Sequence, residues 1–309
     1  MARSVDLPVV DLASPDLRAA ASSVRQACVE HGFFYVTNHG VEAGLLEAVF
    51  AESRRFFELP MEEKMALRRN SSHRGYTPPY AEKLDAASEF QGDLKESFYI
   101  GPTGDGDWQN DLNQWPSEEH FPSWKETMKL YLTAVLATSK RILSLIAMSL
   151  DLDEFFQKIG AFNNPSPVIR LLHYPGEVNE SDSGNYGASA HSDYGAITLL
   201  ATDGTPGLQI CRERDRRHQL WEDVHHVDGA LIVNIGDLLE RWTNCLFRST
   251  LHRVVAVGKE RYSVAFFLDP NPDLLVECLE SCCSEANPPR FPPIRSGDYL
   301  NERLSATYK

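Results

Sequence analysis

The chain has 309 residues, of which 42% are apolar and 24% charged, and its 30 Lys and Arg against 44 Asp and Glu give a formal net charge of −14. This composition allows a sizeable core and excludes both intrinsic disorder of the whole chain and a low-complexity polymer. The acidic balance argues against nucleic acid or an anionic membrane as the main partner, because both reward clustered positive charge.

The first residues contain no apolar run long enough for a signal peptide, and no stretch reaches the roughly 18 uninterrupted apolar residues of a spanning helix. The six cysteines, at positions 28, 211, 245, 278, 282 and 283, form no CxxC pair. They are predicted to be reduced, mostly buried thiols in a cytoplasmic protein. Cys278, Cys282 and Cys283 are close enough in sequence to suggest a metal or redox site, but a thiol-rich surface loop is the simpler interpretation.

Helical patterns dominate the first half of the chain. A cap residue and a proline at positions 14–16 open a predicted helix that runs to Gly32. The aromatic and β-branched run Phe33–Val36 predicts a short strand, and a second helix is predicted over Leu45–Phe57. From Trp124 to Leu150, apolar residues recur at helical spacing, which predicts a long helix laid against a core.

After residue 165 the pattern changes to short β-rich runs separated by Gly, Pro, Asn and Asp. The predicted strands are Val168–Leu172, Ala196–Ala201, Gly207–Cys211, Leu231–Asn234, Leu251–Val255 and Tyr262–Phe267. Strands at this spacing favour a sandwich or barrel over a parallel α/β sheet. The chain is therefore predicted to be α+β with a jelly-roll-like core. Residues 1–110 form a mixed helical region, 111–160 the long supporting helices, and 161–309 the β core with a C-terminal segment, all in one functional unit.

Two of the ten histidines stand out by their context. His191 and Asp193 are two residues apart, and such residues on an extended segment point to the same face, so both can reach one metal ion. A histidine–x–aspartate pair also arises often by chance and needs context. His252 lies further along in an apolar β run, where a packed core histidine is the commoner finding.

Two histidines and one carboxylate make the facial triad of non-haem iron(II) oxygenases, which leaves coordination positions open for a cosubstrate and dioxygen. Such a site also needs a cation for the far carboxylate of a 2-oxo acid, and arginine matches a carboxylate best. Arg261 and Ser263 alternate with Tyr262 on a predicted strand, so the guanidinium and the hydroxyl point the same way. A hairpin turn at 257–260 would place this strand beside that of His252. A surface salt bridge is the alternative for Arg261.

Together these motifs resemble the iron(II)/2-oxoglutarate-dependent dioxygenases, and more narrowly their isopenicillin N synthase-like branch, which includes many plant and fungal small-molecule oxidases. Residues 7–12 are similar to the opening strand of that branch, 32–40 to its N-terminal signature and 56–64 to its next helix. Further matches are Thr198-Leu199-Leu200, Gly207-Leu208-Gln209 and Asn234-Ile235-Gly236-Asp237. The resemblance covers nearly the whole chain, and it implies a double-stranded β-helix (jelly roll) core with N-terminal and flanking α-helices.

The resemblance also implies roles for individual residues. The implied iron ligands are His191, Asp193 and His252. The implied 2-oxoglutarate ligands are Arg261 and Ser263, at the distal carboxylate, and Tyr174, which matches the second tyrosine of the branch's Asn-Tyr-Tyr-Pro motif. The chain departs from that motif, because Leu172 replaces the asparagine and His173 the first tyrosine. His173 then either makes a different contact or is simply packed.

The implied activity is oxidation, usually hydroxylation, of a small-molecule metabolite such as a plant hormone or specialised metabolite. It is coupled to decarboxylation of 2-oxoglutarate to succinate and CO2, requires Fe(II) and O2, and uses ascorbate as the reductant in vitro. One alternative is an iron oxidase of the ring-forming type that does not use 2-oxoglutarate. Another is a non-catalytic small-molecule-binding homologue, against which the intact triad, arginine and serine speak. We expect a monomeric enzyme with neither nucleic acid nor membrane as a partner.

In this branch the substrate lies between the β core, the N-terminal region and the C-terminal segment, and aromatic walls suit a flat or apolar substrate. Candidate wall residues, each about equally well explained as core packing, are Tyr76, Tyr80, Phe98, Tyr99, Phe247 and Phe267. Arg74, Lys95 and Arg241 are candidate partners for a substrate carboxylate, although a solvated or salt-bridged charge is the commoner role.

Overall fold

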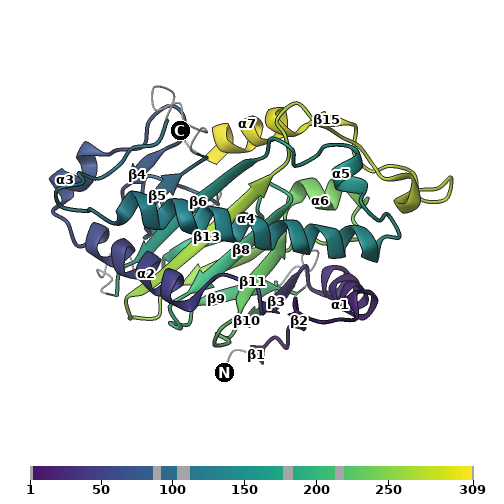
Figure 1. Cartoon of the computed structure of the whole chain (residues 1–309), viewed down its shortest axis with the longest axis horizontal. Helices are drawn as coiled ribbons and strands as arrows, with labels where there is room; N and C mark the ends of the chain where they lie inside the picture. Colours follow the sequence, from purple (N-terminus) through teal and green to yellow (C-terminus); the bar gives the residue numbers. More distant parts are fainter. Residues whose placement is uncertain (1–2, 86–91, 103–111, 177–183, 213–218, 308–309) are drawn as a thin grey trace.

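Two facing β-sheets form the centre of the computed structural model, which describes residues 3–85, 92–102, 112–176, 184–212 and 219–307 (Figure 1). The eight-stranded sheet contains, in spatial order, β2 (Val9–Asp11), β3 (Phe33–Thr37), β11 (Leu231–Ile235), β8 (Ile197–Thr202), β13 (Arg261–Asp269), β6 (Ser166–Tyr174), β5 (Glu96–Ile100) and β4 (Gly75–Thr77). The five-stranded sheet contains β1 (Arg3–Ser4), β10 (Trp221–Asp223), β9 (Leu208–Cys211), β12 (His252–Val255) and β7 (Tyr186–His191). Strands β14 (Leu275–Val276) and β15 (Ile294–Arg295) pair separately. The predicted α+β class with a jelly-roll core is confirmed.

Helices cover the outer face of the larger sheet. Those that pack on its strands are α1 (Leu17–Glu30), α2 (Ala43–Phe57) and α4 (Trp124–Ser149). The other helices are α3 (Met61–Ala66), α5 (Phe155–Lys158), α6 (Asp237–Trp242), the short 3-10 helix η3 (Glu280–Cys282) and the C-terminal α7 (Ser296–Thr307). Figure 1 shows α4 running across the sheet, and α4 contacts α1, α2, β6, β8 and β13. By length and composition α4 is apolar enough to cross a membrane, but 56% of its most apolar window is buried, as in the core helix of a globular domain.

Alternation along the strands divides the core into two parts. On β13, Val264, Phe266 and Leu268 face the helices, whereas Ala265 and Phe267 face the second sheet. Successive side chains of a strand point to opposite faces, so one strand supplies both layers. The space between the sheets is therefore lined by every second residue of β13, and the candidate ligands lie there.

Each predicted helix and strand is present in the structure, with ends that differ by up to three residues. The first helix begins at Leu17, and its cap is Asp16, whose carboxylate accepts a 2.9 Å hydrogen bond from the Ala19 N–H. Residues 14 and 15 therefore precede the cap. All six cysteines are free, as predicted, but only Cys28 and Cys211 are buried, because the other four lie near the partly exposed loops that flank α6 and η3.

Candidate metal centre and active site

Three ligand side chains from two separate parts of the chain meet between the two sheets. Strands β7 and β12 pair with His191 directly opposite His252, so the two imidazole rings lie 4.3 Å apart by their centroids. Oδ1 of Asp193 lies 3.8 Å from Nε2 of His191 and 3.6 Å from Nε2 of His252. One ligand atom from each residue lies within 4.8 Å of the others. Strand β7 ends at His191, so the following loop, and not the strand, places Asp193.

Hydrogen bonds to neighbouring groups leave three ligand atoms available for one ion. Nδ1 of His191 donates to the carbonyl of Ser189 at 2.7 Å, and Nδ1 of His252 donates to the carbonyl of Thr250 at 3.1 Å. Carbonyl oxygens only accept, so both Nδ1 atoms carry the proton and both Nε2 atoms present a lone pair. A divalent metal that prefers imidazole and carboxylate therefore fits this site.

The carboxylate of Asp193 is oriented from its other oxygen. Oδ2 accepts hydrogen bonds from Thr198 Oγ1 at 2.6 Å and from Asn234 Nδ2 at 2.7 Å. Burial alone would raise the pKa of Asp193, but the two imidazoles and these hydrogen bonds outweigh it and lower the pKa overall. Burial lowers the pKa of His191. The site therefore offers a carboxylate and a neutral imidazole at neutral pH, which are the protonation states that bind a metal.

A second group of side chains faces the triad from the larger sheet. Arg261 is 2% exposed, and its Nη1 donates to Ser263 Oγ at 3.2 Å while its Nε donates to the Thr205 carbonyl at 3.2 Å. The guanidinium lies over the ring of Tyr174, 4.9 Å from the ring centroid. These side chains and the triad line one cavity of about 60 Å³. A buried, fixed guanidinium there is suited to a carboxylate ligand.

The predicted hairpin between the strands of His252 and Arg261 is wrong. Strand β12 belongs to the five-stranded sheet and β13 to the eight-stranded sheet, where β13 lies between β8 and β6. The segment 256–260 therefore crosses from one sheet to the other. Arg261 faces the triad across the space between the sheets, which leaves room for a ligand that touches both.

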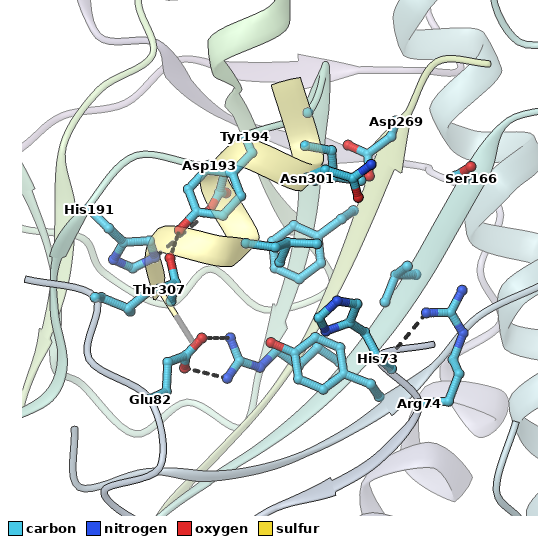
Figure 2. A pocket seen from close by; sticks show the side chains of 18 of the residues that line it. His73, Arg74, Glu82, Ser166, His191, Asp193, Tyr194, Asp269, Asn301 and Thr307 are labelled. Atoms are coloured by element: carbon cyan, nitrogen blue, oxygen red, sulfur yellow. Dashed lines mark hydrogen bonds and ion pairs between the residues drawn. The ribbon is translucent and has the colours of Figure 1, made fainter. Parts of the chain in front are cut away.

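A larger cavity of about 270 Å³ opens on the other side of the triad (Figure 2). His191 and Asp193 line both cavities, as do Arg170 and Phe267. Figure 2 shows His191 and Glu82 on one side of this pocket and Asp269 with Asn301 on the other. Asn301 belongs to α7, whose residues Leu300, Leu304 and Thr307 also line the cavity. The C-terminal helix therefore forms part of the wall, as the family resemblance implied for the C-terminal segment, although no pattern in the sequence predicted the helix or these residues.

Three of the predicted wall residues lie elsewhere. Tyr76, Phe98 and Phe247 are fully buried in the core under the helices and line neither cavity, so their prediction as pocket residues is wrong. Phe98 packs edge-on against Trp124, 5.7 Å between ring centroids, because alternation turns it toward the helices and turns its neighbour Tyr99 toward the larger cavity.

The other candidates are divided between the site and the surface. Phe267 lines both cavities, Arg74 lines the larger one and Lys95 the smaller one. Tyr80 is 41% exposed and lines neither. The guanidinium of Arg241 donates to the Pro292 carbonyl at 2.9 Å, away from both cavities.

A buried ionic network borders both cavities. Lys95 Nζ lies 2.6 Å from Asp93 Oδ2 and 2.8 Å from Glu82 Oε2, and Arg170 contacts both carboxylate oxygens of Glu82. Burial would lower the pKa of Lys95, but the two carboxylates outweigh it and raise the pKa. Lys95 is thus a paired charge and not a free partner for substrate. Arg170 and Glu82 were missed because no motif surrounds them in the sequence.

His173 makes a contact of its own in place of the branch's tyrosine. Its Nδ1 lies 2.7 Å from Glu96 Oε1 and its Nε2 lies 2.8 Å from Glu260 Oε1. The ring also stacks on Tyr262, 4.6 Å between centroids. His173 and Tyr174 point to opposite faces of β6, so this substitution alters the helix side of the strand and leaves Tyr174 facing Arg261.

Comparison with known proteins agrees with the geometry. The N-terminal domain model of the non-haem dioxygenases in morphine synthesis matches residues 7–118, and the 2OG-Fe(II) oxygenase superfamily model matches residues 165–270. Kihadalactone A synthase from Citrus sinensis is 42% identical over 97% of this chain and 91% of its own length. The 2-oxoglutarate-Fe(II) type oxidoreductase hxnY from Emericella nidulans is 36% identical over 92% of this chain and 84% of its own.

Solved structures show the same relationship. A full-length Neurospora crassa protein, crystallised in complex with alpha-KG, superposes with a TM-score of 0.86 at 30% identity, covering 99% of each chain. The two alternatives, an oxidase that does not use 2-oxoglutarate and a non-catalytic homologue, are not favoured by these relatives. The chain belongs to the 2-oxoglutarate- and iron(II)-dependent oxygenase superfamily, and it is a dioxygenase that uses Fe(II), 2-oxoglutarate and O2.

Proposed function

We propose that this enzyme hydroxylates a small, largely apolar specialised metabolite in the 270 Å³ cavity, with iron at the triad and 2-oxoglutarate in the smaller cavity. The observation that carries this proposal is the position of His191 and Asp193 in the wall that both cavities share. A metal held by these residues would be within reach of ligands bound in either cavity. The name of the relative Kihadalactone A synthase supports a specialised metabolite as the substrate class.

The chain's own residues bind and orient the reactants. Nε2 of His191, Nε2 of His252 and Oδ1 of Asp193 would hold the iron, which supplies the oxidising chemistry with O2 when bound. Arg261 would pair with the distal carboxylate of 2-oxoglutarate, and Ser263 would donate a hydrogen bond to it. Tyr174 holds the Arg261 guanidinium in place through its ring face.

Apolar walls keep water away from the reacting position. Val168 of β6, Phe267 of β13 and the leucines Leu300 and Leu304 of α7 line the larger cavity. A substrate bound against them displaces water, which strengthens every polar interaction inside the site. A cytoplasmic location and a monomeric state stay predictions.

Anaerobic titration with Fe(II) and 2-oxoglutarate tests the assignment. The wild-type protein should develop a visible charge-transfer band, and His191→Ala and His252→Ala should abolish both the band and turnover. Succinate release measured over a panel of metabolites should then identify the substrate. His226→Ala, at a half-exposed histidine that pairs with Asp228, is the matched control and should leave the band intact. A band of full intensity in His191→Ala would contradict the proposed site.

A further inference from the structure

A buried carboxyl group lies in the wall of the larger cavity, outside the triad. Asp269 is the last residue of β13 and is 6% exposed. It pairs in register with Ser166 of β6, and both residues line the cavity. Figure 2 shows Asp269 beside Asn301 of α7, on the side of the pocket away from His191.

The other buried acids around the site are fully engaged, and Asp269 is not. Each of them accepts hydrogen bonds from at least two donors; they are Glu82, Asp93, Glu96 and Asp193. Among the residues that the structure describes, no donor forms a hydrogen bond to the Asp269 carboxyl, and its charged neighbour Asp193 repels it. A buried polar group without a partner is costly, and native proteins seldom keep one without a function.

The backbone of Gly195 packs directly against this carboxyl. A Cβ atom added to Gly195 would lie 1.9 Å from Asp269 Oδ1, so glycine is needed next to it. Burial, followed by repulsion from Asp193, raises the pKa of Asp269 to about 7. A hydrogen-bond donor that entered the cavity would relieve this desolvation, and hydrogen bonds to charged groups are the stronger ones.

We propose that Asp269 anchors the substrate, and that the substrate has an apolar skeleton carrying one O–H or N–H donor that binds this carboxylate. The skeleton lies against Val168, Leu300 and Leu304, and its far side reaches the triad. This inference rests on the proposed function, because it takes the 270 Å³ cavity as the substrate pocket. Asp269 is thus a specificity-determining residue.

Three matched probes test the inference by NMR: borneol, its methyl ether and bornylamine. The protein is loaded anaerobically with Mn(II) and 2-oxoglutarate, and paramagnetic broadening of the probe signals reports binding near the triad. Borneol or bornylamine should bind the wild type about tenfold or more tightly than the ether, which keeps the oxygen but has no donor.

Variants at two acidic positions complete the test. Asp269→Leu should bring the probes to within about threefold of one another, Asp269→Asn should keep part of the preference through its amide oxygen, and both should keep the Fe(II)–2-oxoglutarate band. Asp273→Leu, at a fully exposed side chain nearby, should keep the whole preference. Equal binding of ether and donor probes to the wild type, or an unchanged preference in Asp269→Leu, overturns the inference alone. No broadening of any probe, with the band intact, overturns the substrate pocket of the proposed function as well.

Discussion

At the scale of single residues, the metal centre depends on groups that contact its three protein ligands and make no contact with the substrates. Thr198 and Asn234 hold one oxygen of Asp193, and carbonyl groups hold both imidazoles. The metal ligands themselves were predictable because the His-x-Asp pair occurs together with the other motifs of the family. Thr198 and Asn234 entered only through the family resemblance, since their contact with Asp193 depends on the pairing of β8 with β11.

Loss of an orienting hydrogen bond should weaken iron binding. We expect Asn234→Ala to lower the Fe(II) affinity about 10- to 100-fold, because Asp193 then keeps only the Thr198 hydrogen bond on Oδ2. Anaerobic metal titration measures this change. Thr133→Val, whose hydroxyl bonds only to its own helix, should have the affinity of the wild type. Equal affinity of the two variants would contradict the orienting role.

Arg261 should matter for the binding of 2-oxoglutarate and not for the binding of iron. Arg261→Ala should raise the 2-oxoglutarate concentration needed for half-maximal band intensity by about 10- to 100-fold, because a charge-assisted pair is lost. Arg261→Lys should recover only part of the lost 2-oxoglutarate affinity, since lysine lacks the planar guanidinium group that binds a carboxylate through two hydrogen bonds. Arg295→Ala, at a largely exposed arginine, is the control. Unchanged 2-oxoglutarate affinity in Arg261→Ala would place the cosubstrate elsewhere.

At the scale of elements, periodicity located most strands and the long helix but missed two elements that build the site. Strand β7 reads Tyr-Gly-Ala-Ser-Ala-His, and its small residues carry no strong strand pattern. Helix α7 is only weakly amphipathic because the cavity side of the helix is polar as well as apolar. Which sheet β13 joins also could not be predicted, because a short connection is compatible with a hairpin or a crossing.

Two side chains of helix α7 contact the same acidic residue of α6, Asp237, which makes this part of its attachment testable. Tyr299 donates to Asp237 at 2.7 Å, and Arg303 lies 3.6 Å from Asp237 and stacks on Tyr194. The double variant Tyr299→Phe/Arg303→Ala should lose about 2 kcal/mol of local stability, which corresponds to roughly a 30-fold faster cleavage within α7. Limited proteolysis followed by mass spectrometry measures this rate.

The iron centre provides the internal control for that experiment. Iron and 2-oxoglutarate binding should stay unchanged, because no triad residue belongs to α7. If α7 in the double variant resisted cleavage as in the wild type, these contacts would not be what holds the helix. If the band were lost together with the helix, α7 would instead be part of the core stability.

At the scale of the whole molecule, buried ion pairs connect the N-terminal segments to the β core. Glu96 of β5 accepts hydrogen bonds from Lys64 of α3 and Tyr76 of β4 and lies against His173 of β6. Burial would raise the pKa of Glu96, but these contacts outweigh it and lower the pKa. A lowered pKa in the folded state adds stability above the unfolded pKa of about 4.3, and this stability disappears as the pH falls.

Replacing this carboxylate should therefore destabilise the protein in a pH-dependent way. Glu96→Gln should lower the free energy of unfolding by about 3 kcal/mol at pH 7, because Lys64 loses its charged partner. The difference in the free energy of unfolding between Glu96→Gln and the wild type should become smaller as the pH falls to 4 and below. Urea unfolding at several pH values measures it, and Glu63→Gln, on the exposed face of α3, should track the wild type. A difference that stays constant from pH 7 to pH 3 would contradict the ionic explanation.

The spacing of residues along strand β13 fixes the distance between the cosubstrate side and the substrate side of the site. Its alternate residues Arg261, Ser263, Ala265, Phe267 and Asp269 line the two cavities in order, from the cosubstrate side to the substrate side. At about 3.3 Å per residue, the ends of this row are roughly 26 Å apart along the strand. Inserting or deleting a single residue would turn half of the row toward the helices. New substrates can therefore be accommodated by exchanging side chains on β13 or by reshaping α7, while the length of β13 itself has to stay the same.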